Sequence, residues 1–540
     1  MEHKIIRIIK SFIFPSFLAA IVSGSACNSG SACNSKMSRQ KDAKEADPRP
    51  NIIFLLTDDQ RDNTLGGMGH PFVKTPNLDR LLKQGVWFAN TYIAQAVSSP
   101  SRVCLFTGMH ERKHGVGFSS SYKLSEGQWA QSYPALLREN GYYTGFIGKF
   151  GVEYYTFKGK AAEKFDFWRA HDGWTKFFPK DFNVASCIPY HDAKEDIITP
   201  IMGESIEMFL DSIKKNQRFC LSVSFNGPHG SQTQSMYTGY DKWREMTRPA
   251  NEEPRLKGSP YYDTLYRNIP FPLPADCCKD PYKYIPKNVF DQSQRKKTYI
   301  YDYDLQTCRE HHIRYYQIIS GIDHIIGKMM KSLEERGLAD NTIIIYTSDN
   351  GLLMGEYGAG GKGQLYDLTS KVPCFIYDPR LPVNMRGRKL ENLVSSLDIT
   401  STILDYAGIQ QPEVMEGSSL VPLIYGEKVK WRDELFLESL FTLRDHPICE
   451  GLRVGKWKYI RMYKWGKRYS EADLDFRGKK PDFEQLFNLE EDPTEHHNLV
   501  DTYEGTRLLD NFRKKCAKYS SDFNLERTLY MKDHEIVPRK

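Results

Sequence analysis

A serine and an arginine, one helical turn apart, open the segment SSPSRVCLFTG, which runs from Ser98 to Gly108. Pro100 suits the first turn of a helix, so Ser98 is expected at a helix N-terminus, where unpaired backbone N–H groups attract an anion. Arg102 can direct its guanidinium toward the same anion from the next turn. The segment therefore predicts a site for a tetrahedral oxyanion such as sulfate or phosphate.

Acidic and amide side chains follow two long apolar runs. Asp58 and Asp59 directly follow the run NIIFLLT, and Asp349 and Asn350 directly follow the run NTIIIYTS. Uninterrupted apolar runs are typical of strands buried on both faces. Because ligands bind beyond the carboxyl ends of strands in an open α/β sheet, these residues are expected at one rim. Three carboxylates and an amide suit a hard divalent cation.

Other polar and basic residues follow two further apolar runs and a glycine-rich loop. YYTGFIG precedes Lys149, FCLSVSF precedes Asn226 and His229, and a glycine-rich loop carries Lys362. All of these side chains are expected at the same rim, where the two lysines would add positive charge around the anion.

The elements that must position these residues alternate between strand and helix patterns. One helix pattern is TPNLDRLLKQG, in which Thr75 is a candidate N-cap and Pro76 suits the first helical position. The alternation predicts an α/β fold over residues 49–430, with a large mixed, mostly parallel sheet flanked by helices. From residue 431 to 540, short alternating strands and a charged helix predict a smaller C-terminal α+β subdomain with an antiparallel sheet.

The long aromatic region from Tyr154 to about His311 is expected to form loops over the rim. Its stretch around Trp168, His171 and Trp174 is either a sugar-stacking wall or ordinary loop packing. The pair formed by His311 and His312 opens a helix pattern and is expected at a solvated helix end.

The N-terminus predicts export. Basic residues precede a short apolar run and small residues, which is typical of an export signal, here over residues 1–26. The apolar run is shorter than the roughly 20 residues that span a bilayer. A linker over residues 27–48 follows, and the repeated GSACNS makes Cys27 and Cys33 candidates for a lipid anchor. The protein is therefore expected in the periplasm or lipid-anchored at a bacterial envelope.

Charge and cysteine content exclude some classes of protein. The 74 basic and 68 acidic residues give a formal charge of +6 without a basic cluster, so no nucleic-acid partner is expected. The 11 cysteines show no zinc-type spacing. Export permits disulfides, but the sequence does not indicate which cysteines pair.

The segment from Ser98 to Gly108 resembles the sulfatase signature, S-x-P-S-R-x-x-x-F-T-G. The segments NIIFLLTDDQ, GYYTGFIGK, NTIIIYTSDNG, GKGQLYDLTSKVPCFIYDP, LVSSLDITSTILDYAGI and LFNLEEDPTEHHNL also resemble sulfatase segments, in the expected order. The resemblance covers the chain from about Pro48 nearly to its end. It implies an alkaline phosphatase-like fold and hydrolysis of sulfate esters, most often on sulfated carbohydrates.

The resemblance also implies a modified nucleophile and a metal. Ser98 would be oxidised to formylglycine by an anaerobic-type radical maturation enzyme, which is an implied partner. The hydrated aldehyde would attack sulfur and later expel sulfate. One calcium ion would be bound by the modified Ser98 together with Asp58, Asp59, Asp349 and Asn350.

The resemblance to sulfatases also implies roles for the remaining site residues. Arg102 would hold the modified side chain, Lys149 and Lys362 would bind sulfate oxygens, and His229 would protonate the departing alcohol. One position departs from the family pattern, because Gly151 stands where many sulfatases have a histidine.

Three questions stay open at this point. A histidine of the region from Tyr154 to His312, or one near His110 and His114, would have to replace the one missing at Gly151, although His110 and His114 are better explained as structural residues. Calcium, arginine and lysine would also suit a phosphoester or phosphonate hydrolase of the same superfamily. A catalytically silent glycan-binding protein is the third class, motivated by Gly151.

Overall fold

The computed structural model describes residues 49–118, 120, 123–152, 160–236, 261–292, 305–464 and 474–533. Asp47–Lys540 form one compact unit. The predicted export signal, the predicted linker and both candidate lipid-anchor cysteines lie outside the described residues. No helix in the described part of the chain combines the length and apolar character needed to cross a membrane.

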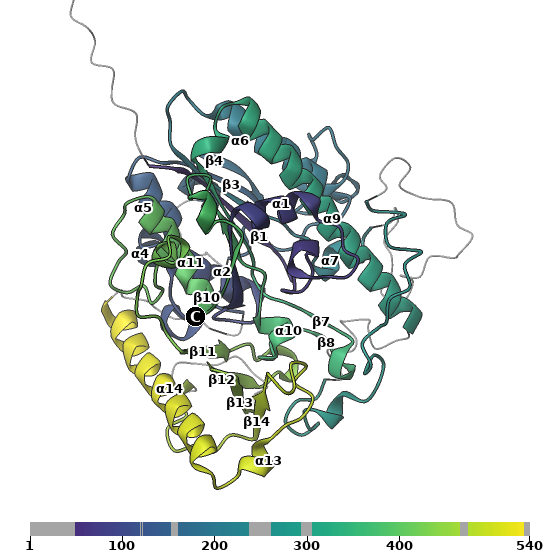
Figure 1. Cartoon of the computed structure of the whole chain (residues 1–540), viewed down its shortest axis with the longest axis vertical. Coiled ribbons are helices and arrows are strands. Elements are labelled where there is room, and N and C mark those ends of the chain that lie inside the picture. The colour runs from purple at the N-terminus through teal and green to yellow at the C-terminus, as the bar shows by residue number, and fades with distance from the viewer. Residues whose placement is uncertain are drawn as a thin grey trace, which may run out of the picture. The chain divides into compact units, whose positions relative to one another are not determined.

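Eight strands form the central sheet, in the order β10-β2-β9-β6-β1-β5-β3-β4 (Figure 1). Strand β9 runs antiparallel to both its neighbours, β2 and β6. The other neighbouring pairs are parallel. This confirms the predicted mixed, mostly parallel sheet. The strands are β1 (Asn51–Thr57), β2 (Val86–Tyr92), β3 (Tyr143–Lys149), β4 (Phe167–His171), β5 (Phe219–Ser224), β6 (Thr342–Ser348), β9 (Phe375–Tyr377) and β10 (Arg388–Ser395).

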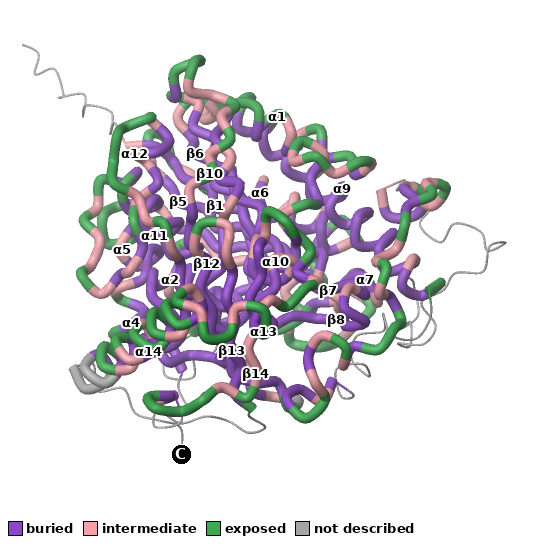
Figure 2. Tube along the Cα trace, turned by 60° about the horizontal axis from the view of Figure 1, so that its bottom comes forward, coloured by how far each residue is buried: buried purple, intermediate pink, exposed green. Residues whose placement is uncertain are grey.

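Helices cover both faces of this sheet, which explains why its central strands are apolar throughout. Ile53 and Leu55 of β1 join one core cluster, whereas Ile52, Phe54 and Leu56 join another. Figure 1 shows α1, α6 and α9 on one side and α2, α5 and α11 on the other. These helices are α1 (Pro76–Gln84), α2 (Ser98–Thr107), α5 (Tyr133–Glu139), α6 (Ile198–Ser212), α9 (Leu305–Glu335) and α11 (Ser396–Tyr406). In Figure 2 the central strands β1, β5 and β6 are buried, as is α2, whereas α1 carries exposed residues on its outward side.

A second, antiparallel sheet has the sequential order β11-β12-β13-β14. Its strands are β11 (Glu434–Ser439), β12 (Ile448–Val454), β13 (Trp457–Tyr463) and β14 (Phe483–Asn488), and α14 (Arg507–Asp533) packs on one face. The other face packs on Tyr92, Leu365 and Tyr366 of the larger part. The predicted C-terminal antiparallel sheet is thus confirmed, while the domain boundaries themselves remain predictions.

The described part of the chain also contains shorter α-helices and strands. They are α3 (Glu111–His114), α4 (Glu126–Ala130), α7 (Gly230–Thr233), α10 (Asp367–Ser370), α12 (Val421–Ile424), α13 (Val500–Tyr503), β7 (Leu353–Met354) and β8 (Gly360–Gly361).

A buried ionic network joins α3 to the second sheet. Arg112 donates from Nε to the Glu438 carboxylate at 3.1 Å and from Nη2 to that of Glu450. Arg461 also binds Glu450, with an Nη2–Oε2 distance of 2.6 Å. All four side chains are at most 6% exposed, so each charge depends on the others for compensation.

Two sequence expectations are corrected. The region from Tyr154 to about His311 is not only rim loops, because it contains β4 at the sheet edge and α6, whose apolar residues pack on α9. His311 and His312 do not lie at a solvated helix end. They are 1% and 3% exposed, and His311 Nε2 lies 2.7 Å from Thr233 Oγ1, because the α7 segment covers this part of α9.

Candidate active site

Four strand ends and one helix start bring the predicted site residues together. Asp58 and Asp59 follow β1, Asp349 and Asn350 follow the neighbouring strand β6, and Ser98 begins α2. Val97 is the N-cap residue, so the structure confirms Ser98 at the helix N-terminus. Lys149 ends β3, and His229 lies in the turn after β5. The carboxylates, Asn350 and Ser98 are all buried.

The oxygen atoms of this group form a close cluster. Ser98 Oγ lies 3.2 Å from Asp58 Oδ1 and 3.2 Å from Asn350 Oδ1. The Asn350 amide donates to Asp59 Oδ1 at 2.6 Å, and the Asp59 backbone N–H donates to Asp349 Oδ1 at 3.2 Å. Three carboxylates, an amide oxygen and a hydroxyl therefore face one another, which is a donor set that fits calcium.

An unusual backbone conformation helps to form the cluster. Asp59 has φ of 65°, in the left-handed region that non-glycine residues rarely occupy. Tyr315 of α9 donates its hydroxyl proton to the Asp59 carbonyl at 2.7 Å, which holds the turn. Such conformations are found where surrounding structure enforces them, often at functional sites.

Three cationic side chains surround the cluster. Lys362 Nζ lies 2.5 Å from Ser98 Oγ and also contacts the Asp59 carboxylate. Lys149 Nζ donates to Asp58 Oδ2 at 2.5 Å. Arg102 donates to Asp349 Oδ2 from Nε at 3.0 Å and from Nη2 at 2.8 Å.

Arg102 also connects separate elements of the site. Its Nη1 donates to the Lys149 carbonyl at 2.8 Å and to the Ser224 hydroxyl. Together with the bonds to Asp349, these contacts fix the start of α2 against the ends of β3, β5 and β6. In this structure Arg102 therefore positions the scaffold around Ser98.

The buried charges perturb one another. Burial opposes ionisation of Asp58, but the positive charges of Lys149, Lys362 and Arg102 hold its pKa well below the ordinary value. Burial raises the pKa of Asp59 in spite of Lys362. Burial and the Asp58 charge raise the pKa of Asp349. Crowded carboxylates of this kind are relieved by a cation among them, which agrees with the donor set.

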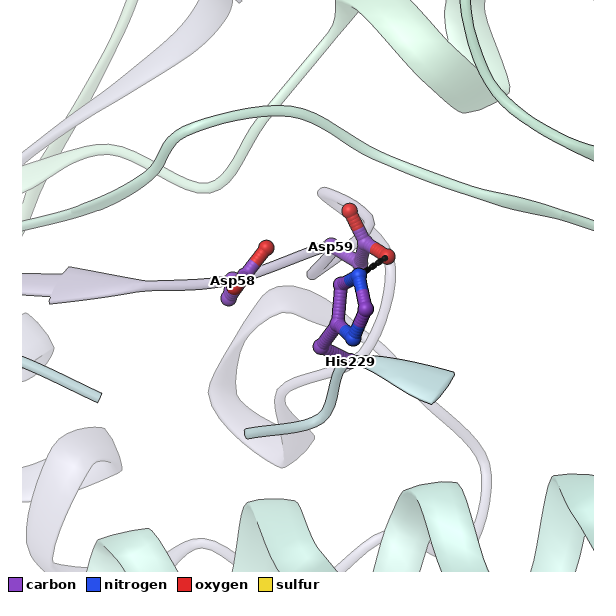
Figure 3. Close-up of side chains that lie close together, drawn as sticks. All are labelled: Asp58, Asp59 and His229. Carbon is purple, nitrogen blue, oxygen red and sulfur yellow. Dashed lines mark ion pairs between the residues drawn. The ribbon is translucent and has the colours of Figure 1, made fainter. Parts of the chain in front are cut away.

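His229 points into the acidic cluster (Figure 3). Its Nε2 lies 3.7 Å from Asp59 Oδ2, and its Nδ1 accepts a hydrogen bond from the Ser231 backbone N–H at 3.0 Å. Because Nδ1 is an acceptor, the proton of the neutral ring is on Nε2. Burial lowers the pKa of His229 to about 3, so the ring is neutral at ordinary pH. The residue presents an N–H donor toward the site.

His229 has a second chemical capacity that sequence reasoning did not assign. Asp58, Asp59 and His229 each offer a potential metal-ligand atom, and these atoms lie within 4.8 Å of one another. The signal was available in the sequence, since each of these residues follows a strand of the same rim. Ligation and proton donation compete for the same ring nitrogen.

Gly151 occupies a conformation that suits glycine. Its φ is 65°, and an added Cβ would lie 3.0 Å from Arg102 Cδ and 3.1 Å from Lys149 Cε. Strand pairing instead brings a histidine beside Lys149 from β4, where His171 is its register partner. His171 is buried, and burial lowers its pKa to about 3.

Two contacts orient the His171 ring. Nδ1 lies 2.6 Å from the Tyr190 hydroxyl, and the Asn226 amide lies 3.0 Å from Nε2. His171 therefore connects β4 to the turn that carries His229. His110 and His114 have the structural contacts that the sequence analysis expected. His110 Nδ1 lies 3.2 Å from Glu416 Oε1, and His114 Nε2 lies 3.4 Å from Cys104 Sγ.

Of the two tryptophans in the aromatic stretch from Trp168 to Trp174, one is packed in the interior and the other is exposed. Trp168 packs among Phe146, Phe150 and Phe165. Trp174 is 60% exposed, and its ring stacks near that of His229, with a centroid distance of 6.0 Å and an interplanar angle of 22°. Only Trp174 of these two tryptophans is therefore placed to meet a ligand at the His229 side of the site.

Comparison with known families and proteins gives consistent matches. The family model described as Sulfatase matches residues 50–409, and the model described as N-sulphoglucosamine sulphohydrolase, C-terminal, matches residues 355–522. The chain is 28% identical over 496 residues to an N-acetylglucosamine-6-O-sulfatase of Bacteroides thetaiotaomicron, covering 84% of this chain and 83% of the relative. It is 27% identical over 491 residues to the human N-acetylglucosamine-6-sulfatase, covering 84% and 81%.

Solved structures share the fold. One, in complex with its substrate D-glucosamine-2-N,6-O-disulfate, has a TM-score of 0.65 at 23% identity and covers 89% of this chain and 98% of its own. A phosphonate monoester hydrolase of Agrobacterium radiobacter has a TM-score of 0.65 at 20% identity and covers 89% and 96%. At these identities the likeness concerns the fold alone.

Proposed function

The chain belongs to the sulfatase family and hydrolyses sulfate esters, and we propose that its substrates are sulfated saccharides, cleaved with formylglycine formed from Ser98 and one calcium ion. The observation that carries the proposal is the position of Ser98. Its Oγ contacts both the carboxylate cluster and Lys362 Nζ, 3.2 Å from Asp58 Oδ1 and 2.5 Å from the ammonium. A nucleophile here has a metal-binding donor set and a cationic group within contact distance.

The modified residue and the metal ion would have different roles in the reaction. A formylglycine at residue 98 would provide a hydrated aldehyde that attacks sulfur and then releases sulfate. Calcium, held by Asp58, Asp59, Asp349, Asn350 and the modified residue, would polarise a sulfate oxygen. The three carboxylates are balanced by three cationic side chains, so a dication leaves the site positive and favours an anionic ester.

The chain's own residues complete the reaction. Lys149 and Lys362 would bind sulfate oxygens, and their charges would oppose the build-up of negative charge during attack. His229 would direct its Nε2–H at the oxygen of the leaving alcohol, and it would protonate that oxygen from the imidazolium form that the bound anionic ester favours. Arg102 would hold the start of α2 so that residue 98 faces the anion.

A saccharide substrate is supported by two observations. The relatives named above include N-acetylglucosamine-6-sulfatases, and one structural neighbour binds a glucosamine disulfate. The leaving alcohol must lie against His229, and the exposed ring of Trp174 lies beside that residue. An apolar sugar face could therefore stack on Trp174 while the ester oxygen meets His229.

The experiment that tests this function is sulfate release from a panel of sulfated saccharides, beginning with 6-O-sulfated N-acetylglucosamine. The protein is matured with the serine-type radical enzyme, and Ser98→Ala is compared with Ser99→Ala, a substitution at the adjacent buried serine. Release should be lost in the first variant and retained in the second. Equal release from both would refute the assigned nucleophile. Phosphate and phosphonate esters in the same panel test the phosphoester alternative.

We further propose that the protein is exported and lipid-anchored at the bacterial envelope through Cys27 or Cys33. The proposal is supported by the N-terminal apolar run and the two GSACNS repeats. Fractionation of cells that express wild-type protein or the Cys27→Ala and Cys33→Ala variants tests it. Recovery of all variants in the cytoplasm, with an intact N-terminal peptide, would contradict it.

A further inference from the structure

Three cysteine sulfurs meet where segment 261–292 passes the N-terminal turn of α9. Cys277 Sγ lies 2.9 Å from Cys308 Sγ and 3.6 Å from Cys278 Sγ. Cys277 and Cys308 are buried, whereas Cys278 is exposed. Within the described ranges, these are the sulfur atoms that approach another cysteine sulfur within hydrogen-bonding distance. The cluster lies outside the group of residues that surrounds Ser98.

The surroundings favour one of the two pairings. A disulfide requires Cα atoms about 4.4–6.8 Å apart, whereas consecutive residues joined by a trans peptide have Cα atoms about 3.8 Å apart. The adjacent pair Cys277 and Cys278 therefore needs a distorted backbone. Cys277 and Cys308 come from separate segments that face each other, and their sulfur separation exceeds an S–S bond by about 0.9 Å.

The loop between Asn350 and Lys362 closes over this pair. Gly355 has φ of 110°, and an added Cβ there would lie 2.9 Å from Cys277 Sγ and 3.4 Å from Cys308 Sγ. The Met354 carbonyl lies 3.5 Å from Cys308 Sγ. A Cβ at residue 355 would clash with Cys277 Sγ and touch Cys308 Sγ, so glycine at this position lets the loop pack directly on the two sulfurs.

We propose that Cys277 and Cys308 form a disulfide in the mature exported protein. Two S–H bonds break and one S–S bond forms. The two protons and two electrons pass to a small-molecule disulfide oxidant, which is reduced to two thiols. The contact with Cys277 and burial raise the pKa of the Cys308 thiol, so the thiol stays protonated and resists external reagents once the fold has closed. The bond is therefore made while the chain folds.

The disulfide would stabilise the segments that pack against the loop carrying Lys362. It ties segment 261–292 to α9, and the loop that leads to Lys362 rests on the bonded pair. That loop is held from its other side by Arg61, whose Nη2 lies 2.8 Å from the Glu356 carboxylate and whose Nε donates to the Leu352 carbonyl at 2.7 Å. Closing the chain between residues 277 and 308 also limits the freedom of the unfolded state.

The test is a thiol map of the full-length protein, folded with oxidised glutathione or with dithiothreitol. After alkylation in denaturant, which exposes every remaining thiol, and digestion, the oxidised sample should contain linked peptides carrying Cys277 and Cys308, lighter by about 2 mass units than the two thiol peptides together. Cys278→Ala should retain the linked peptides, and Cys308→Ala should lose them. This measurement does not depend on sulfatase activity, so it tests the disulfide independently of the proposed function.

A melting experiment provides a second measurement. The oxidised wild-type protein should melt about 3–6 °C above the reduced protein, and Cys308→Ala should show no such difference. Alkylation of both cysteines in the oxidised wild-type protein would overturn the proposal, and so would a link between Cys277 and Cys278. Stoichiometric zinc in native mass spectra would also overturn it, since His312 Nδ1 lies 3.8 Å from Cys308 Sγ and offers a further soft ligand.

Discussion

Replacing Trp174 by alanine is expected to weaken saccharide binding while leaving sulfate binding unchanged. The side chain is 60% exposed, so about 150 Å² of an indole of about 250 Å² is open to a ligand. A sugar ring that covers one of the two faces would bury about 75 Å², worth about 1.9 kcal/mol at 25 cal/mol per Å². The dissociation constant should therefore rise about 20-fold.

Isothermal titration calorimetry in a Ser98→Ala background measures this constant without turnover. Trp174→Phe should lose only a part of the affinity, because a smaller ring still offers an apolar face. Leu525→Ala, at a residue of α14 that is 63% exposed, controls for the general loss of apolar surface. A change of less than threefold in Trp174→Ala, or an equal loss of affinity for inorganic sulfate, would refute the stacking argument.

Three further predictions concern catalysis, the metal and stability. His229→Gln should slow hydrolysis of sugar sulfates about 10²–10⁴-fold, but hardly that of aryl sulfates whose phenols leave without protonation; equal loss with both substrates would exclude proton donation. A chelator should lower the melting temperature and abolish sulfate release, and calcium should restore both, with stabilisation of about 2.7 kcal/mol at 100 times its dissociation constant. An unchanged melting curve would contradict the metal site. Glu450→Gln should cost about 3–5 kcal/mol in denaturant unfolding because Arg112 and Arg461 lose their shared carboxylate, whereas Glu434→Gln, whose Lys515 partner is half-exposed, should cost less than about 1 kcal/mol.

The rim residues were predictable from sequence because they directly follow apolar strands. Neighbouring parallel strands end at one rim, so Asp58, Asp59, Asp349 and Asn350 could be placed together without knowledge of loop structure. The start of α2 was also predictable from the sequence, because a proline in the first turn indicates where a helix begins. The structure supports both placements through the contacts around Ser98.

Other features depend on contacts that sequence spacing does not encode. His171 reaches Lys149 through pairing of β3 with β4, and β4 was hidden in an aromatic region expected to form loops. Its partner Tyr190 comes from a separate turn. The apolar periodicity of α6 is present in the sequence, but the aromatic and proline residues around it are typical of loops. The burial of His311 and the approach of Cys277 to Cys308 arise from contacts between segments that are far apart along the chain.

The measurement that tests the central claim most directly relates sulfate release to the aldehyde content of residue 98. Preparations matured to different extents are digested, and formylglycine is quantified as a peptide about 2 mass units lighter than its serine form. The rate of sulfate release from one sulfated saccharide should rise in proportion to the aldehyde fraction and extrapolate to zero at zero aldehyde. Full activity in protein that retains only serine at position 98 would contradict the account.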